Sequence, residues 1–207
     1  MKKQMIALIA AALLLWNCKE NEIETSHFEL VPAQSVAEWK GFLKTGYFNN
    51  GTIDVISKSL VVQNGKVSGG SFTIPVSSIV NLNLPTEALK EQLVHHLQSA
   101  DFFNMAMHPD ISYSISDVTP YSGTTAEDVQ GANYMVKGSL TILGKSNPVS
   151  FPAKIIVAEN QLTVEANVKF DRTKWGITFA SDPALPAENY IEPLVEMHLK
   201  LTGNKKL

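Results

Sequence analysis

The sequence predicts a mainly β protein, an extended antiparallel barrel of roughly eight strands with a helical segment at about residues 86–99 capping one end. Between residues 134 and 170, three segments in a row alternate apolar and polar side chains, which is typical of antiparallel strands covered on one face. With the segments before and after them, the strands suffice for a closed barrel that can hold one small ligand. Because a single helix interrupts this series of strands, we interpret it as a lid over an open end.

Size and composition agree with one large globular domain. The chain has 207 residues, of which 44% are hydrophobic and 18% are charged, so it carries enough apolar material for a sizeable core. This balance excludes a disordered chain and a polytopic membrane protein. The net charge of −3 and the scattered lysines offer no basic face, and we therefore expect no nucleic-acid partner.

The first residues are typical of an exported protein. Lys2 and Lys3 precede an apolar run over residues 5–16, which is too short to span a bilayer comfortably and is typical of a signal-peptide core. Cys18, the only cysteine, follows at once. This arrangement resembles the lipobox of bacterial lipoproteins, in which the cysteine becomes the lipidated first residue. The alternative is an ordinary signal peptide followed by an incidental cysteine.

These features divide the chain into three parts. We expect a signal peptide over residues 1–17, a lipidated cysteine with a flexible polar tether over residues 18–27, and one β-barrel domain over residues 28–207. The expected location is the bacterial cell envelope. There the protein would be anchored in a membrane by its N-terminus, on the periplasmic face or at the cell surface.

Turn signals divide the first half of the domain into strands. Pro32 breaks the first apolar segment, and Gly46 with Asn49–Gly51 indicates a turn. Asn64–Gly65 is the strongest hairpin signal, because both residues tolerate the positive φ of a type I′ turn. The strands expected here cover residues 28–43, 52–62 and 66–74.

The helix has recognisable signals of its own. Thr86 is suited to the N-cap, and Glu87 lies in the first turn, where a negative charge is favourable. Leu89, Leu93 and Leu97 repeat every four residues and form a narrow apolar stripe. One face of the helix should therefore pack while the other meets water. The stripe is too narrow to require a dimer, although this helix and its neighbours are the candidate surface for a homodimer.

The second half of the domain is a meander of alternating strands. A polar loop over residues 119–132 and turns at residues 144–148 and 159–160 separate the strands. The expected strands cover residues 111–118, 134–143, 149–157, 162–170 and 195–201.

Four stretches resemble the YceI-like (lipid- and polyisoprenoid-binding) proteins, a lipocalin-like barrel group. They follow one another in the family's order and span nearly the whole domain: Gly69–Ile74 with Ser78 and Ile79, Leu97–Phe103 with Pro109, Gly138–Gly144 with Val149 and Phe151, and Phe170–Ile177. The resemblance implies a lipocalin-like barrel with an apolar lumen that holds an isoprenoid or other long lipid, and it implies no catalysis. The chain departs from the family at Asn49, where many relatives carry a histidine, and at Pro75–Val76, where relatives often have an acidic residue.

The strand pattern supplies candidates for the lumen. An apolar tunnel stabilises a long lipid by about 0.8 kcal/mol for each methylene group removed from water. Each candidate could also be an ordinary core residue, and only a hollow barrel would make them a site. The candidates are Trp39, Phe72, Phe102, Phe103, Tyr113, Tyr134, Leu140, Phe151, Val164, Val168 and Trp175.

Asp101 and Arg172 are the candidates for contact with a polar head group. The alternative for Asp101 is a carboxylate that accepts hydrogen bonds at the end of the helix. The alternatives for Arg172 are an ion pair with Asp101 or Asp171, or stacking on the indole of Trp175. The sequence favours the structural role for both residues.

Metal and catalytic sites find little support in the sequence. His95 and His96 are adjacent, so they point to different helix faces and cannot chelate together as a pair four residues apart would. Ser99, His96 and Asp101 could form a hydrolase set on paper, but the chain has no G-x-S-x-G motif. We expect no metal and no cofactor other than a bound lipid or isoprenoid quinone.

The sequence therefore predicts non-enzymatic binding of an isoprenoid-type or other long-chain lipid, such as a polyisoprenoid quinone, by an envelope carrier or scavenger. The expected partners are this lipid and the membrane that holds the N-terminal anchor. Two alternatives stay open: a structural or adhesion lipoprotein with a filled barrel, and a hydrolase.

Overall fold

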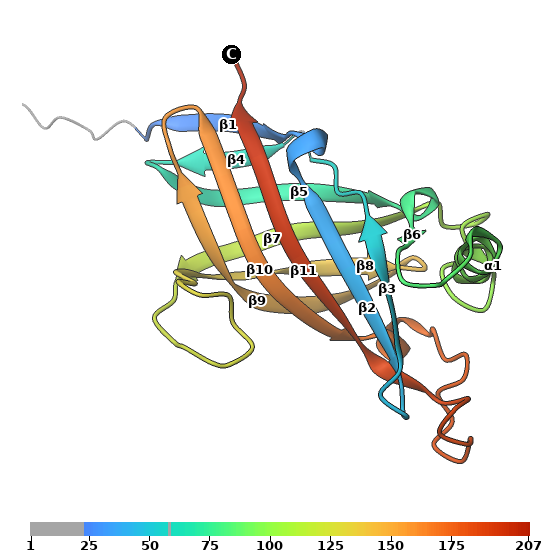
Figure 1. Cartoon of the computed structure of the whole chain (residues 1–207). Coiled ribbons are helices and arrows are strands. Elements are labelled where there is room, and N and C mark those ends of the chain that lie inside the picture. The colour runs from blue at the N-terminus through green and yellow to red at the C-terminus, as the bar shows by residue number, and fades with distance from the viewer. Residues whose placement is uncertain (1–22, 58) are drawn as a thin grey trace, which may run out of the picture.

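The computed structural model describes residues 23–57 and 59–207, so the expected signal peptide and Cys18 lie outside the described residues. In the described part, eleven strands form one antiparallel sheet, accompanied by one α-helix (Figure 1). The strands are β1 (Thr25–Leu30), β2 (Val36–Leu43), β3 (Phe48–Ile53), β4 (Leu60–Gln63), β5 (Lys66–Pro75), β6 (Val80–Asn81), β7 (Asp110–Pro120), β8 (Tyr134–Ile142), β9 (Lys145–Val157), β10 (Gln161–Asp171) and β11 (Ile191–Lys205). The helix α1 covers Glu87–Gln98, and three short 3-10 helices cover Pro32–Gln34 (η1), Val76–Ser78 (η2) and Arg172–Trp175 (η3).

Eight of these strands close into a barrel, in the order β1-β4-β5-β7-β8-β9-β10-β11, because β11 also pairs with β1. All neighbouring pairs are antiparallel. The prediction of an antiparallel barrel of about eight strands with one helix is confirmed.

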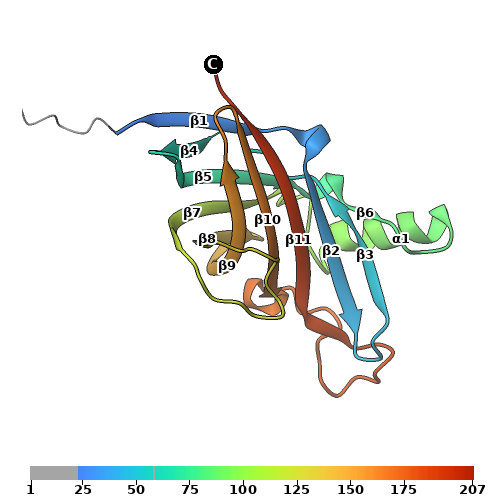
Figure 2. The ribbon, with the colours of Figure 1, turned by 60° about the vertical axis from the view of Figure 1, so that its left-hand side comes forward.

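The long strand β11 joins the barrel to a second group of strands. Its last residues, 203–205, pair with β1, whereas residues 191–200 pair with β2. The strands β1 and β2 therefore lie end to end along β11, separated by η1, which begins at Pro32 as the predicted break requires. Beyond β2, the strands β3 and β6 extend the sheet past the closed barrel (Figure 2).

The barrel has two distinct ends. The hairpin end carries the turn at Asn64–Gly65, the loop of residues 121–133 and the turn at residues 158–160. The helix end carries α1, the turn between β8 and β9, and residues 176–190 (Figure 1). At the hairpin end Asn64 and Gly65 have φ of 48° and 75°, which confirms the positive values expected for the hairpin turn.

Two predicted turns are present, but their predicted bounds are wrong. The turn between β8 and β9 is a two-residue hairpin at Leu143–Gly144, with φ of 51° and 71°, and residues 145–148 belong to β9. Asn49–Gly51 lies inside β3, and the preceding turn is confined to residues 44–47. In both places residues that favour turns continue a strand, because a neighbouring strand satisfies their backbone.

The predicted strand over residues 52–62 is also wrong in its middle. Between Ile53 and Leu60 the chain leaves β2 and crosses to β1, so it cannot keep one strand neighbour. Among residues 54–57 and 59, only Ile56 pairs, in a single bridge to Thr73. The last strand is longer than predicted, since β11 begins at Ile191 and ends at Lys205.

The helix lies across one end of the barrel, as predicted (Figures 1 and 2). The Thr86 hydroxyl accepts a hydrogen bond from the Leu89 N–H at 3.3 Å, so Thr86 is the N-cap. No residue of α1 is buried, and Leu89 is 43% exposed, so the apolar stripe packs only in part. Within residues 23–57 and 59–207, no helix is long and apolar enough to cross a membrane.

Candidate ligand-binding cavity

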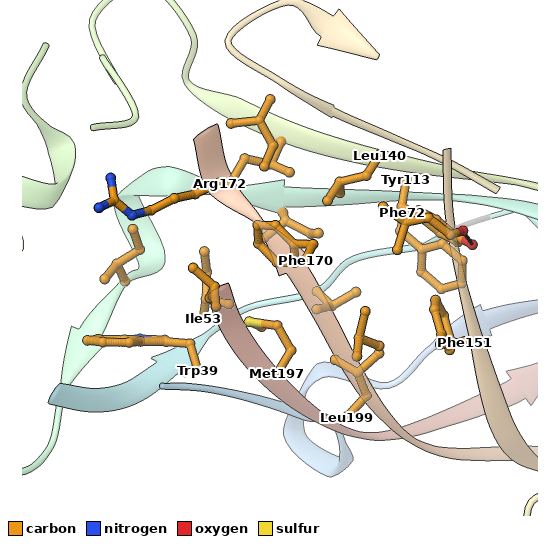
Figure 3. A pocket seen from close by; sticks show the side chains of 18 of the residues that line it. Trp39, Ile53, Phe72, Tyr113, Leu140, Phe151, Phe170, Arg172, Met197 and Leu199 are labelled. Carbon is orange, nitrogen blue, oxygen red and sulfur yellow. Dashed lines mark hydrogen bonds between the residues drawn. The ribbon is translucent and has the colours of Figure 1, made fainter. Parts of the chain in front are cut away.

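The barrel encloses a cavity of about 270 Å³ (Figure 3). This volume is many times what a single water molecule needs. The lining comes from the barrel strands, from β2 and β3, and from α1 through Leu93 and Leu97. The barrel is therefore hollow along its length and not filled by its own side chains.

Strand alternation decides which residues face this cavity. On β11, Val195, Met197 and Leu199 line the cavity, and on β10 Val164 and Val168 do so. The residues of opposite parity, such as Glu165 and Lys169 on β10 and Glu196 and His198 on β11, point outward and form cross-strand contacts with one another. Lys169, for example, donates to Glu196 at 3.0 Å on the outer face. The polar outer face and the apolar inner face together fix the register of the two strands.

Nine of the eleven predicted lumen residues line the cavity, and their contact with a ligand stays a prediction. They are Trp39, Phe72, Phe102, Phe103, Tyr113, Leu140, Phe151, Val164 and Val168.

Tyr134 and Trp175 do not line the cavity. Tyr134 lies at the start of β8, where it pairs with Pro120 of β7 and Ala153 of β9. Trp175 lies in η3 and is 1% exposed, and its Nε1 donates to the Leu140 carbonyl at 2.9 Å. Its ring stands edge-on to the ring of Phe170, with the centroids 5.5 Å apart. Trp175 therefore packs behind a residue that lines the cavity.

An aromatic cluster lines one part of the lumen (Figure 3). The ring of Tyr113 lies 6.2 Å from Phe72 and 5.8 Å from Phe151, measured between centroids. Gly138 on β8 makes room for this ring, since a Cβ there would overlap it. The Tyr113 hydroxyl donates to the Val149 carbonyl at 3.1 Å, and burial raises the pKa of Tyr113. The phenol therefore stays neutral and satisfied, and this region presents an apolar surface to a ligand.

Arg172 is 3% exposed and lies at the helix end of the lumen (Figure 3). Its guanidinium donates to four main-chain carbonyls: those of Ile177 at 2.8 Å, Phe179 at 3.0 Å, Ile191 at 3.0 Å and Glu192 at 3.4 Å. Burial lowers the pKa of Arg172, although an arginine keeps its proton. The side chain thus ties the end of β10 to the following loop and to the start of β11.

The sequence favours an ion pair of Arg172 with Asp101 or Asp171. Among the described residues this prediction is wrong. The Asp171 carboxylate instead accepts hydrogen bonds from the N–H and the hydroxyl of Thr173 and caps η3. The guanidinium does not stack on Trp175 but lies 5.8 Å from the centroid of Phe102. The sequence could not predict these partners, because every residue has a main-chain carbonyl and the residue type does not show which carbonyls will accept a hydrogen bond from Arg172.

Asp101 lies on the outer surface, with its side chain 55% exposed, and does not line the cavity. Its carboxylate is 3.1 Å from His96 Nε2, and its N–H donates to the Ser99 hydroxyl. The structure therefore gives Asp101 the helix-end role that the sequence favoured.

The structure brings together only part of the candidate hydrolase set of Ser99, His96 and Asp101. His96 and Asp101 form a pair, but the Ser99 hydroxyl donates to the main-chain carbonyl of His96 at 2.8 Å and not to its ring. The His96 ring stands edge-on to Phe102 and Phe179, with centroids 5.0 and 4.8 Å away. These contacts attach α1 to the loop of residues 176–190. Among residues 23–57 and 59–207, no three His, Cys, Asp or Glu side chains gather as a metal site would require.

Sequence reasoning missed several lining residues of the helix end. They are Gly41 on β2, Asn49 on β3, Phe170 on β10, and Glu192 and Met197 on β11. Strand parity alone could have identified Phe170 and Met197. Asn49 was assigned to a turn, so its side chain had no predicted direction.

Comparison with known proteins places the chain among similar barrels. A family described as the YceI-like domain matches residues 28–203. A UPF0312 protein of Pectobacterium carotovorum is 29% identical over 94 residues, which cover 42% of this chain and 44% of that protein. A UPF0312 protein of an Enterobacter strain is 28% identical over 116 residues, which cover 53% and 56%. The chain thus spans about half the length of the curated relatives it matches.

Two solved structures share the fold. BcnA of Burkholderia cenocepacia has a TM-score of 0.62 at 17% identity, covering 84% of this chain and 98% of that chain. A polyisoprenoid-binding domain from Saccharophagus degradans, implicated in plant cell wall breakdown, has a TM-score of 0.60 at 10% identity and covers 87% and 99%. These likenesses confirm the predicted lipocalin-like barrel.

Proposed function

The chain belongs to the YceI-like domain family, and on that premise we propose that its lumen binds one long-chain lipid of the isoprenoid type without converting it chemically. The observation that carries the proposal is the cavity of about 270 Å³, whose lining is apolar except at the helix end. Such a lumen takes up a hydrocarbon chain by removing it from water and needs no directed chemistry. The polyisoprenoid-binding domain with the same fold supports this ligand class.

A binding protein also accounts for the polar residues better than an enzyme does. The buried Arg172 uses four of its five N–H groups on main-chain carbonyls, and the Ser99 hydroxyl is engaged at the end of the helix. Neither residue is placed as a nucleophile or a general base. The hollow lumen also weighs against a structural lipoprotein with a filled barrel.

The test blocks the lumen from one strand. Val164 lines the cavity, so in Val164→Trp the indole should occupy the lipid's space. The matched control is Thr163→Trp, where the added ring points outward from the same strand. We expect organic extracts of the wild-type protein and of Thr163→Trp to contain a long-chain lipid in near-stoichiometric amount by mass spectrometry. The extract of folded Val164→Trp should lack it.

The proposal fails if the wild-type extract contains no lipid and the purified protein also refuses added isoprenoids. It also fails if Val164→Trp, with wild-type circular dichroism, carries as much lipid as the control.

We further propose that the protein acts in the bacterial cell envelope as a carrier or scavenger, exported by residues 1–17 and anchored through a lipid on Cys18. The apolar run before this cysteine supports the proposal. Changing Cys18 to Ser should leave an unlipidated protein that moves from the detergent phase to the aqueous phase in Triton X-114 partitioning. An unchanged distribution, or an unchanged mass of the N-terminal peptide, would contradict the anchor.

A further inference from the structure

The turn between β2 and β3 lies at the helix end, beside the loop of residues 176–190 (Figures 1 and 2). Every residue of this turn is exposed. Its backbone is nevertheless well held, because the Leu43 N–H donates to the Tyr47 carbonyl at 2.8 Å and the Lys44 N–H donates to the Tyr190 carbonyl at 3.1 Å. The turn is therefore a fixed projection that presents its side chains to the surroundings.

The outer face of the sheet next to this turn carries a group of apolar side chains. Phe42 on β2 and Phe48 on β3 are direct cross-strand partners with ring centroids 6.0 Å apart, and Phe48 is 39% exposed. Tyr47 in the turn is 50% exposed. Leu194, which is 52% exposed, lies in the bulge of β11 opposite Phe42. Apolar groups that gather on an exposed surface mark a place of contact with another molecule or with a membrane.

Two lysines lie close to the aromatic rings of this surface. Lys40 Nζ is 4.6 Å from the ring centroid of Phe48 and 5.9 Å from that of Phe42. Lys44 Nζ is 5.5 Å from the ring centroid of Tyr190. Aromatic rings together with lysine ammonium groups are typical of the interface between the apolar core and the head groups of a bilayer.

The charges of these lysines are not neutralised by an ion pair. In the part of the chain that the structure describes, neither Lys40 nor Lys44 forms one. Glu196, the cross-strand partner of Lys40, is 3.0 Å from Lys169 instead. A second copy of the chain on the same face would bring the same lysines together. Lipid phosphate groups, in contrast, complement their charge.

This surface continues directly into the lining of the lumen. Gly41, Phe42 and Leu43 line the cavity, and so does Ile191, the partner of Leu43 on β11. The exposed turn therefore begins where the lining of the cavity ends. A membrane in contact with the turn would lie next to the helix end of the lumen.

We propose that the β2–β3 turn and the sheet face beside it form a docking surface for an anionic phospholipid bilayer. Tyr47, Phe48 and Leu194 enter the interfacial region, and Lys40 and Lys44 contact lipid phosphate groups. The inference goes beyond lipid binding by the lumen, because it states which part of the protein meets the membrane with which lipid is exchanged.

The first test detects whether the turn itself enters the bilayer. It uses the full chain with Cys18→Ser, so that no lipid anchor holds the protein, and vesicles of phosphatidylcholine and phosphatidylglycerol in equal parts. In Tyr47→Trp the added emission should shift to the blue on vesicle binding and be quenched by brominated acyl chains. The spectrum of the parent protein is subtracted to remove its own tryptophans. The control is Thr163→Trp, on the outer face at the hairpin end, whose added emission should not change.

A second test measures what the apolar side chains contribute to vesicle affinity, by flotation in the same background. Phe48→Ser should weaken binding roughly ten-fold, because one aromatic side chain is no longer removed from water. The matched control is Ile156→Ser, which removes a 52% exposed apolar side chain from the outer face of β9 at the hairpin end. This control should bind as tightly as the parent protein, since all variants share the same N-terminus.

A third test measures the contribution of charge. Lys40→Gln with Lys44→Gln should weaken binding roughly twenty-fold, because each lysine near an anionic surface adds about a factor of five. The loss should shrink at high salt, where such attraction is screened. The matched control is Lys154→Gln with Lys200→Gln, which removes the same charge beside Glu165 and should leave the affinity unchanged.

The inference is overturned if the Tyr47→Trp emission does not respond to vesicles, or if Phe48→Ser binds them as tightly as Ile156→Ser. It is also overturned if sedimentation shows a dimer that Phe48→Ser dissociates, while vesicle affinity stays the same, since the face would then pair two copies. Val164→Trp, which blocks the lumen, should still dock. Failure of docking therefore leaves the proposed lipid binding intact, and failure of lipid binding leaves docking intact.

Discussion

The two ends of the barrel belong to one sheet but are held together in different ways. At the hairpin end, β1 closes the ladder between β4 and β11, and Phe28, Val62 and Leu162 are at most 2% exposed. At the helix end, no residue of α1 is buried, and Phe179, which contacts the helix, is 40% exposed. There the loop of residues 176–190 is not part of the ladder, and the guanidinium of Arg172 binds its carbonyls at Ile177 and Phe179.

This difference separates stability from access. Fully buried apolar side chains and a continuous ladder give the hairpin end its share of the free energy of folding. At the helix end the barrel wall is buried as well, at Ile142, Trp175 and Ile177, but α1 itself has no buried residue, and segments with few buried contacts open locally at lower free energy. It also carries the polar residues of the lumen. We expect a ligand to enter at the helix end while the hairpin end stays closed.

Matched leucine truncations should show the largest contrast. Leu162→Ala at the hairpin end removes a side chain that is 1% exposed, and we expect a loss of about 3 kcal/mol in the free energy of unfolding. Leu93→Ala on α1 removes a half-buried side chain and introduces a better helix former, so the loss should be about 1 kcal/mol or less. Urea unfolding followed by circular dichroism measures both values. Equal losses would mean that the two ends are packed alike.

Arg172→Met tests how the helix end is held. The methionine keeps most of the side-chain volume but leaves four carbonyl oxygens without their donor, and we expect a loss of about 2 kcal/mol. Arg172→Lys should not restore stability, because one ammonium cannot reproduce the fork of the guanidinium. Hydrogen exchange should localise the effect to residues 176–192. Protection lost evenly over the whole barrel would contradict the division into two ends.

The contrast between the ends also explains what the sequence could predict. The strands of the meander follow from alternation, because the inner face of β9 and β10 is apolar at every second residue, and the Asn64–Gly65 turn follows from φ preferences. These are local rules, and they describe the hairpin end well. The N-cap of α1 at Thr86 was equally local and was predicted correctly.

The helix end depends on partners that are distant in the sequence, and there the predictions failed. Asn49–Gly51 has the composition of a turn, yet the side chains of Asn81 and Asn83 hold it as a strand. The four carbonyl groups come within reach of Arg172 only when the loop has folded around its side chain. Whether the barrel is hollow could not be predicted either, because alternation fixes the direction of a side chain and not the volume left between facing walls.

The smallest expected effect concerns the opening of the helix alone. In Thr86→Ala the helix loses its N-cap hydrogen bond, which should cost about 1 kcal/mol in the local stability of α1. Because α1 has no buried residue, the global free energy of unfolding should hardly change, whereas the dissociation rate of a bound isoprenoid should rise roughly five-fold if the helix must open for release. Stopped-flow displacement measures this rate, and Thr86→Ser, which retains the cap oxygen, is the control. A rise in both variants, or in neither, would show that lipids leave by a route that does not involve α1.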